Sequence, residues 1–96
     1  MSNRTEPRMT AELRDALFAR LLGETGEGVC VYCGKRVSRF LKLSDPRRAT
    51  LDHLVPLSKG GGNESDNFVI ACRSCNSRKG SLSADRFRQL RKRIYG

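Results

Sequence analysis

Two pairs of cysteines constrain this chain more than any other feature of its sequence. Cys30 and Cys33 form one Cys-x-x-Cys pair, and Cys72 and Cys75 form a second pair after the intervening segment 34–71. Each pair alone could be a redox motif or two core cysteines. Four thiolates in two tight turns are, however, typical of a tetrahedral structural zinc site, which we favour over disulfides or free thiols. The fold must then bring the two pairs together.

The length of the chain agrees with a need for such a metal. A chain of 96 residues with no tryptophan and 30% charged residues can build only a small hydrophobic core, and small domains often use a structural metal to compensate. We expect one domain over residues 10–96 after a disordered leader over residues 1–9. The polar N-terminus resembles neither a signal peptide nor a membrane span, so we expect a reducing, cytoplasmic location, where paired cysteines usually bind metal.

The net charge points to a polyanionic partner. Nineteen Lys and Arg against ten Asp and Glu give a formal charge of +9, which on a small domain creates a positive surface potential. A solvated basic surface without a partner is the alternative, and we favour nucleic acid because the charge accompanies candidate hydrolytic residues. A membrane surface is less favoured, because no strongly amphipathic basic helix is evident.

Helices are predicted at both ends of the domain. Thr10 is a candidate N-cap, Gly23 a candidate helix end, and the apolar residues between them suggest a packing helix that covers the metal site. Ser83 is a candidate N-cap of the last helix, in which Phe87, Leu90 and Ile94 form a narrow apolar stripe among basic residues.

The middle of the chain predicts a β-hairpin followed by a short helix. Residues 49–55 and 67–71 are short apolar segments that we expect to pair as antiparallel strands. The connecting loop contains three glycines at 60–62, which could cradle a phosphate but more commonly make a flexible turn. The second cysteine pair should lead into a helix that ends at Gly80, and residues 35–49 should form a strand or an irregular ribbon.

His53 is the only histidine and the strongest candidate for catalysis. An imidazole can accept a proton from water near neutral pH, and Asp52 and Asn76 offer oxygen ligands suited to Mg²⁺ or Mn²⁺. Asn67 could orient the imidazole through a hydrogen bond to its ring or backbone. One objection follows from strand geometry, because neighbouring residues such as Asp52 and His53 point to opposite faces of a regular strand. We therefore expect a twist or a bulge there.

These residues together resemble a known family, the HNH endonucleases, and in particular their phage and bacterial subgroup with two zinc knuckles. The resemblance covers residues 28–80 and lies in Asp52-His53-x-x-Pro56, Gly60-Gly61, Asn67 and Cys72-x-x-Cys75-Asn76-x-x-Lys79-Gly80. It implies a small α+β protein with a ββα-metal core, a four-cysteine zinc site and flanking helices.

The resemblance also implies roles for individual residues. His53 would be the general base, Asn67 would orient it, and Asp52 and Asn76 would bind a catalytic Mg²⁺ or Mn²⁺. The last histidine of the family's name is Asn76 here, and a carboxamide binds softer metals less well than imidazole does.

The substrate implied is DNA, most simply double-stranded, cleaved with little sequence specificity. We expect the protein to be monomeric and to bind the DNA backbone through basic residues, namely Arg47, Arg48, Arg78, Lys79, Arg88 and Lys92. Phage packaging machinery is a candidate protein partner. The competing hypothesis is a zinc-stabilised DNA-binding or adaptor module without catalysis, which would not need Asp52, His53 and Asn76 to converge.

Overall fold

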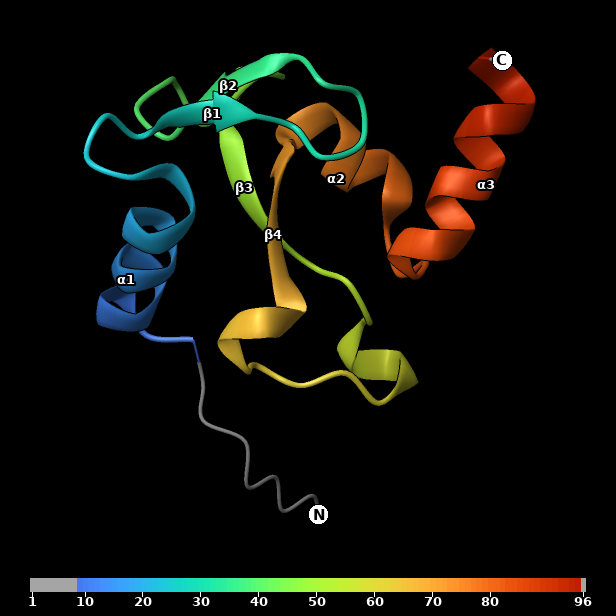
Figure 1. Cartoon of the computed structure of the whole chain (residues 1–96), viewed down its shortest axis with the longest axis horizontal. Coiled ribbons are helices and arrows are strands. Elements are labelled where there is room, and N and C mark those ends of the chain that lie inside the picture. The colour runs from blue at the N-terminus through green and yellow to red at the C-terminus, as the bar shows by residue number, and fades with distance from the viewer. Residues whose placement is uncertain (1–8, 96) are drawn as a thin grey trace.

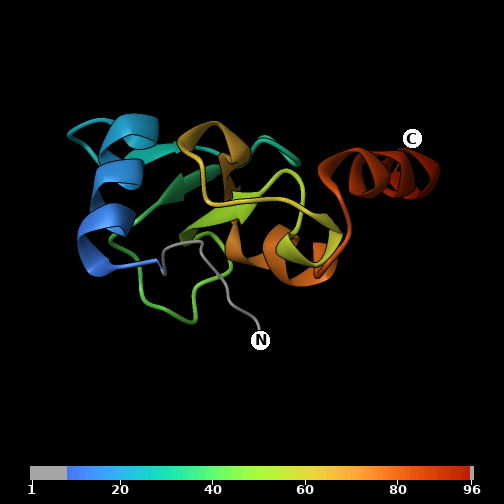
Figure 2. The same cartoon turned by 90° about the horizontal axis from the view of Figure 1, so that it is seen from below.

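The computed structural model describes residues 9–95, so all of the predicted leader except Met9 lies outside the described residues. The chain begins with a helix, continues through four short strands and ends with two helices, as Figures 1 and 2 show. In order they are α1 (Ala11–Leu22), β1 (Glu27–Val29), β2 (Arg36–Ser38), β3 (Ala49–His53), the 3-10 turns η1 (Leu57–Lys59) and η2 (Ser65–Asn67), β4 (Phe68–Cys72), α2 (Arg73–Lys79) and α3 (Ala84–Tyr95). None of the described helices is long and apolar enough to cross a membrane.

The centre of the fold is the β3–β4 hairpin with α2 directly after it. The two strands pair antiparallel from Ala49 opposite Cys72 to His53 opposite Phe68. This is the predicted hairpin, with β3 ending two residues earlier and β4 shifted by one. The ladder is continuous through Asp52 and His53, so the bulge that we expected is not present at these residues. Together β3, β4 and α2 form the ββα unit that the sequence predicts.

A second hairpin, β1–β2, carries the first cysteine pair in its turn. Glu27–Val29 pairs antiparallel with Arg36–Ser38, and Gly34 in the turn has a φ of 74°, the left-handed conformation expected for it. The backbone N–H of Val31 donates to the carbonyl of Ile70, which fixes this turn against β4. The ribbon predicted over 35–49 is a strand only in β2, and the chain then turns irregularly to reach β3.

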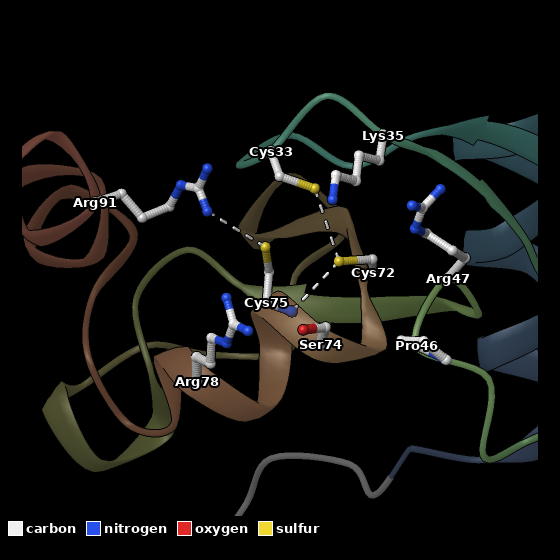
Figure 3. Close-up of a pocket in the computed structure, with 9 residues that line it drawn as sticks. All are labelled: Cys33, Lys35, Pro46, Arg47, Cys72, Ser74, Cys75, Arg78 and Arg91. Atoms are coloured by element: carbon white, nitrogen blue, oxygen red, sulfur yellow. Dashed lines mark hydrogen bonds between the residues drawn. The ribbon is translucent and has the colours of Figure 1, made fainter. Parts of the chain in front are cut away.

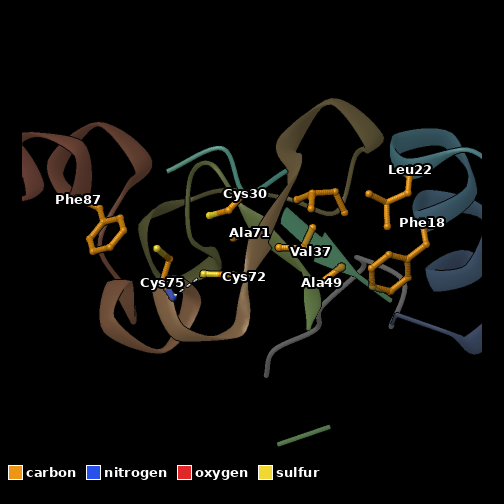
Figure 4. Close-up of a cluster of buried hydrophobic side chains, with 10 residues drawn as sticks. Phe18, Leu22, Cys30, Val37, Ala49, Ala71, Cys72, Cys75 and Phe87 are labelled. Carbon is orange, nitrogen blue, oxygen red and sulfur yellow. Dashed lines mark hydrogen bonds between the residues drawn. The ribbon is translucent and has the colours of Figure 1, made fainter. Parts of the chain in front are cut away.

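Helix α1 begins at the predicted N-cap but packs against the hydrophobic core, not over the metal site. The Thr10 hydroxyl accepts a hydrogen bond from the N–H of Leu13, which caps the helix. Leu17, Phe18 and Leu22 are its buried residues. Figure 4 places Phe18 and Leu22 at the opposite end of the hydrophobic cluster from Cys75, so α1 covers the core and not the metal site.

Helix α3 contacts the rest of the fold through its first turns and through Arg91, whose Nη1 lies 3.9 Å from Cys75 Sγ. The Ser83 hydroxyl accepts from the N–H of Arg86, as expected of an N-cap, and the Phe87 ring is buried edge-on against the Tyr32 ring. Ile94, predicted to continue the apolar stripe, is 71% exposed. The reason is visible in Figure 1, where the C-terminal part of α3 extends away from the other elements.

Candidate functional site

The four cysteines converge although the two pairs are far apart in the sequence. Their sulfur atoms all lie within 4.8 Å of one another, and Cys33 Sγ and Cys72 Sγ are 3.9 Å apart. A zinc ion with Zn–S bonds of about 2.3 Å requires sulfurs separated by about 3.8 Å in a tetrahedron. The donor set and its spacing therefore fit a tetrahedral zinc ion, as predicted.

Hydrogen bonds to sulfur prepare these cysteines for a metal. The N–H of Tyr32 donates to Cys30 Sγ and the N–H of Cys75 to Cys72 Sγ, both at 3.3 Å. Burial opposes ionisation of Cys30, but hydrogen bonds from the backbone around it outweigh burial and lower the pKa of its thiol to about 7. Burial raises the pKa of the Cys72 and Cys75 thiols. Since zinc binds thiolates, metal binding must release protons here.

Removing one sulfur should unfold the protein. Cys75 is 3% exposed and lies in the first turn of the helix that carries Asn76, so Cys75→Ser should lose zinc and the folded state together. Structural zinc contributes on the order of 10 kcal/mol in small domains, more than such a core can replace. Circular dichroism and bound-zinc analysis measure both effects, with Ser77→Ala on the same helix as control. A folded, heat-stable Cys75→Ser protein would contradict the zinc assignment.

A cavity lies between β3 and α2, where the predicted catalytic residues meet. It has a volume of about 310 Å³. Asp52 and His53 line it from the end of β3, and Asn76 and Lys79 line it from α2. The two strand residues contact different partners, yet both line this cavity.

Asp52 is held on both of its carboxylate oxygens. Lys79 Nζ lies 3.2 Å from Oδ1, and the Tyr32 hydroxyl donates to Oδ2 at 2.5 Å. Lys79 Nζ also donates to the carbonyl of His53 at 3.1 Å. Asp52 and Lys79 are only 5% and 2% exposed, so this is a buried ion pair. Burial and then the hydrogen bond to Asp52 raise the pKa of the Tyr32 phenol, which remains a donor at neutral pH.

His53 is oriented by a residue that the sequence analysis did not identify. Its Nε2 lies 2.9 Å from Oδ1 of Asn63, and its ring packs on the Phe68 ring at 4.5 Å between centroids. An amide oxygen can only accept, so Nε2 carries the proton and Nδ1 is the basic atom. Asn63 follows the glycines of the loop, and nothing in its local sequence distinguishes it from an ordinary turn residue.

Asn67 fixes the loop instead of the imidazole ring. Its Oδ1 accepts from the N–H of Val55, and its Nδ2 donates to the carbonyls of Val55 and Gly62. Its own carbonyl accepts from the N–H of Leu54. Asn67 therefore braces both ends of the loop that carries Asn63, and its effect on His53 is indirect.

Asn76 and Asp52 supply the donor atoms that a hard cation needs. Asn76 Nδ2 donates to the Thr50 hydroxyl at 3.0 Å, so the carboxamide oxygen is the atom that could bind a metal. Each oxygen of the Asp52 carboxylate has a second lone pair beyond the one used by Lys79 or Tyr32. Carboxylate and carboxamide oxygens fit Mg²⁺ or Mn²⁺.

The basic residues predicted to bind DNA fall into three groups. Arg47, Arg78, Arg88 and Lys92 are exposed. Arg48 is half-buried and donates to the carbonyl of Leu41, so its guanidinium supports the loop before β3. Lys79 is buried in the ion pair with Asp52, and its ammonium does not belong to the exposed basic surface that we expected.

The buried ion pair generates a stability prediction. Lys79→Ala leaves the Asp52 carboxylate buried without its cation, and loss of one partner from a buried pair costs roughly 3–5 kcal/mol. Urea unfolding in excess zinc measures the decrease in stability, and Lys59→Ala, which removes an exposed lysine, is the control. Equal stability of the two variants would mean that the Lys79–Asp52 ion pair contributes little.

Comparisons with known proteins show the family to which the chain belongs. The family model for HNH endonuclease matches residues 30–82, more than half of the chain. The chain is also similar to the Type IV methyl-directed restriction enzyme EcoKMcrA of Escherichia coli (strain K12), with 31% identity over 64 residues. The matched segment is 67% of this chain and 23% of that enzyme, so most of the relative lies outside the similarity.

Proposed function

Because the chain belongs to the HNH endonuclease family, we propose that it is a metal-dependent endonuclease that hydrolyses phosphodiester bonds in double-stranded DNA. The observation that carries this proposal is the cavity between β3 and α2. It brings an imidazole, a carboxylate and a carboxamide together, from His53, Asp52 and Asn76. The combination offers a proton acceptor beside hard oxygen ligands, which is what phosphodiester hydrolysis requires.

His53 is the proposed general base. With Nε2 held by Asn63, Nδ1 is available to take a proton from the attacking water. The ring is also held by Phe68, so its position does not depend on a single hydrogen bond. Asp52 and Asn76 would hold the catalytic ion. The chemistry that a bound Mg²⁺ or Mn²⁺ supplies is stabilisation of the charge that develops on the phosphate and leaving oxygens.

Substrate binding would be mainly electrostatic. The net charge of +9 and the exposed arginines favour contacts with the DNA backbone, and such contacts carry no direct sequence information. We therefore propose low intrinsic sequence specificity.

One observation favours the second candidate, a zinc-stabilised DNA-binding module without catalysis. Both oxygens of Asp52 already have partners, and one of them is the Lys79 ammonium, whose charge opposes a nearby divalent cation. Incubation of supercoiled plasmid with the protein, with and without Mg²⁺ or Mn²⁺, separates the two functions. Metal-dependent relaxation or linearisation supports the endonuclease, and binding without cleavage supports the module.

Replacement of the proposed base gives the sharpest test of catalysis. His53→Ala should retain zinc, fold and DNA affinity but cleave at least about a hundredfold more slowly, the usual scale of general base catalysis. No other histidine can substitute for it. Glu64→Ala, an exposed change in the same loop, is the control. Cleavage by His53→Ala at the wild-type rate would mean that another base or a contaminant is responsible.

Asn63, which orients the proposed base His53, should affect the rate of DNA cleavage and its pH dependence. Asn63→Ala should slow cleavage about tenfold or more. This is the lower end of the effect seen when a residue that orients a functional side chain by a hydrogen bond is removed. Asn63→Asp keeps an acceptor at Nε2 and adds a negative charge, which stabilises imidazolium. It should restore much of the rate and shift the acidic limb of the pH–rate profile to higher pH. If the two variants have identical profiles, Asn63 does not act through His53.

A further inference from the structure

A large basic cavity lies over the cysteine cluster, outside the proposed catalytic site. Its volume is about 550 Å³. Figure 3 shows its nine lining residues, with cationic side chains approaching the cysteine sulfurs from both sides. The four cations are Lys35, Arg47, Arg78 and Arg91. They come from four segments: the turn before β2, the loop before β3, helix α2 and helix α3.

Charge balance shows that the zinc site does not account for all four cations. Zinc with four thiolates carries a formal charge of −2. Arg91 faces this charge directly, since its Nη1 lies 3.9 Å from Cys75 Sγ. Four cations exceed two negative charges, and no carboxylate is among the described residues that line the cavity. Lys35, Arg47 and Arg78 are exposed at its surface. A cavity lined in this way would attract an anionic ligand.

The chemistry of the lining suits a phosphodiester. Guanidinium groups bind phosphate oxygens through paired hydrogen bonds, and ammonium groups bind them as point charges. Ser74 adds a hydroxyl donor to the same cavity. Arg47 and Arg78, which were predicted to bind DNA, meet here, whereas Lys35 and Arg91 were not among the predicted DNA-binding residues.

The basic cavity and the proposed catalytic cavity are both lined by residues of helix α2. The two cavities share no lining residue, and each takes residues from α2: Asn76 and Lys79 line one, and Cys75 and Arg78 line the other. Helix α2 therefore separates them. We propose that the basic cavity is a second phosphate site, which binds a backbone phosphate of the DNA other than the one cleaved. The inference rests on the proposed function. A phosphate bound in the basic cavity would help to position the DNA strand across α2.

The test compares two double variants that remove the same charge. Lys35→Gln with Arg47→Gln removes two exposed cations of the cavity, and Arg20→Gln with Lys42→Gln removes two exposed cations that line neither cavity. Both are made in the His53→Ala background, so that DNA stays intact. Anisotropy of a labelled DNA duplex is measured across a salt series, and zinc release to a chromogenic chelator is measured in parallel.

The cavity variant should bind DNA about tenfold more weakly or worse at physiological salt, with the salt slope reduced by roughly 0.9 for each phosphate that the variant no longer neutralises. The control should keep its slope. Equally weakened binding in both variants overturns the proposal in favour of diffuse attraction. Unchanged binding with faster zinc release also overturns it, because the cations would then serve only the thiolates. If a double variant unfolds, the comparison is repeated with two single variants, Arg47→Gln for the cavity and Arg20→Gln as its control.

Failure of catalysis would be distinguishable from failure of this site. If wild-type protein cleaves no plasmid but the cavity variant alone binds DNA more weakly, the endonuclease proposal fails and the phosphate site stands. If wild-type protein cleaves plasmid and the two double variants bind DNA alike, the endonuclease proposal stands and the phosphate site fails.

Discussion

The convergence of four sulfurs on one point is the constraint on which the structure depends. The two cysteine pairs belong to different hairpins, and the described chain has few large apolar side chains to hold those hairpins together. At one end the cluster fixes the turn that contains Tyr32, and at the other it fixes the first turn of α2. Since α2 supplies Asn76 and Lys79, the cysteine cluster also positions one wall of the proposed catalytic cavity.

Much of the fold is predictable from the sequence, because its signals are local. The cysteine spacing predicts the metal cluster, Thr10 and Ser83 predict two helix starts, and apolar segments predict the paired strands of the central hairpin. A twist or a bulge was expected at Asp52 and His53, and the continuous ladder excludes the bulge. Both residues nevertheless line the same cavity.

What the sequence did not predict depends on interactions between distant residues. In the sequence, Tyr32 is a spacer between two cysteines, Asn63 a turn residue and Lys79 a surface cation. The partners that define them are Asp52 and His53, between 10 and 27 positions away. Local sequence patterns carry no information about such pairs. Ile94 lies in the predicted helix but is exposed. Helical periodicity identifies an apolar face but not whether anything lies opposite it.

The hydroxyl of Tyr32 joins two centres that are otherwise separate. Tyr32 stands between the zinc ligands Cys30 and Cys33, and it holds the carboxylate proposed to bind the catalytic ion. Thermodynamic linkage is reciprocal. Any cation that binds Asp52 more tightly when the zinc turn is formed must therefore tighten zinc binding by the same factor. The two metals would then behave as mutual effectors, each raising the affinity of the protein for the other.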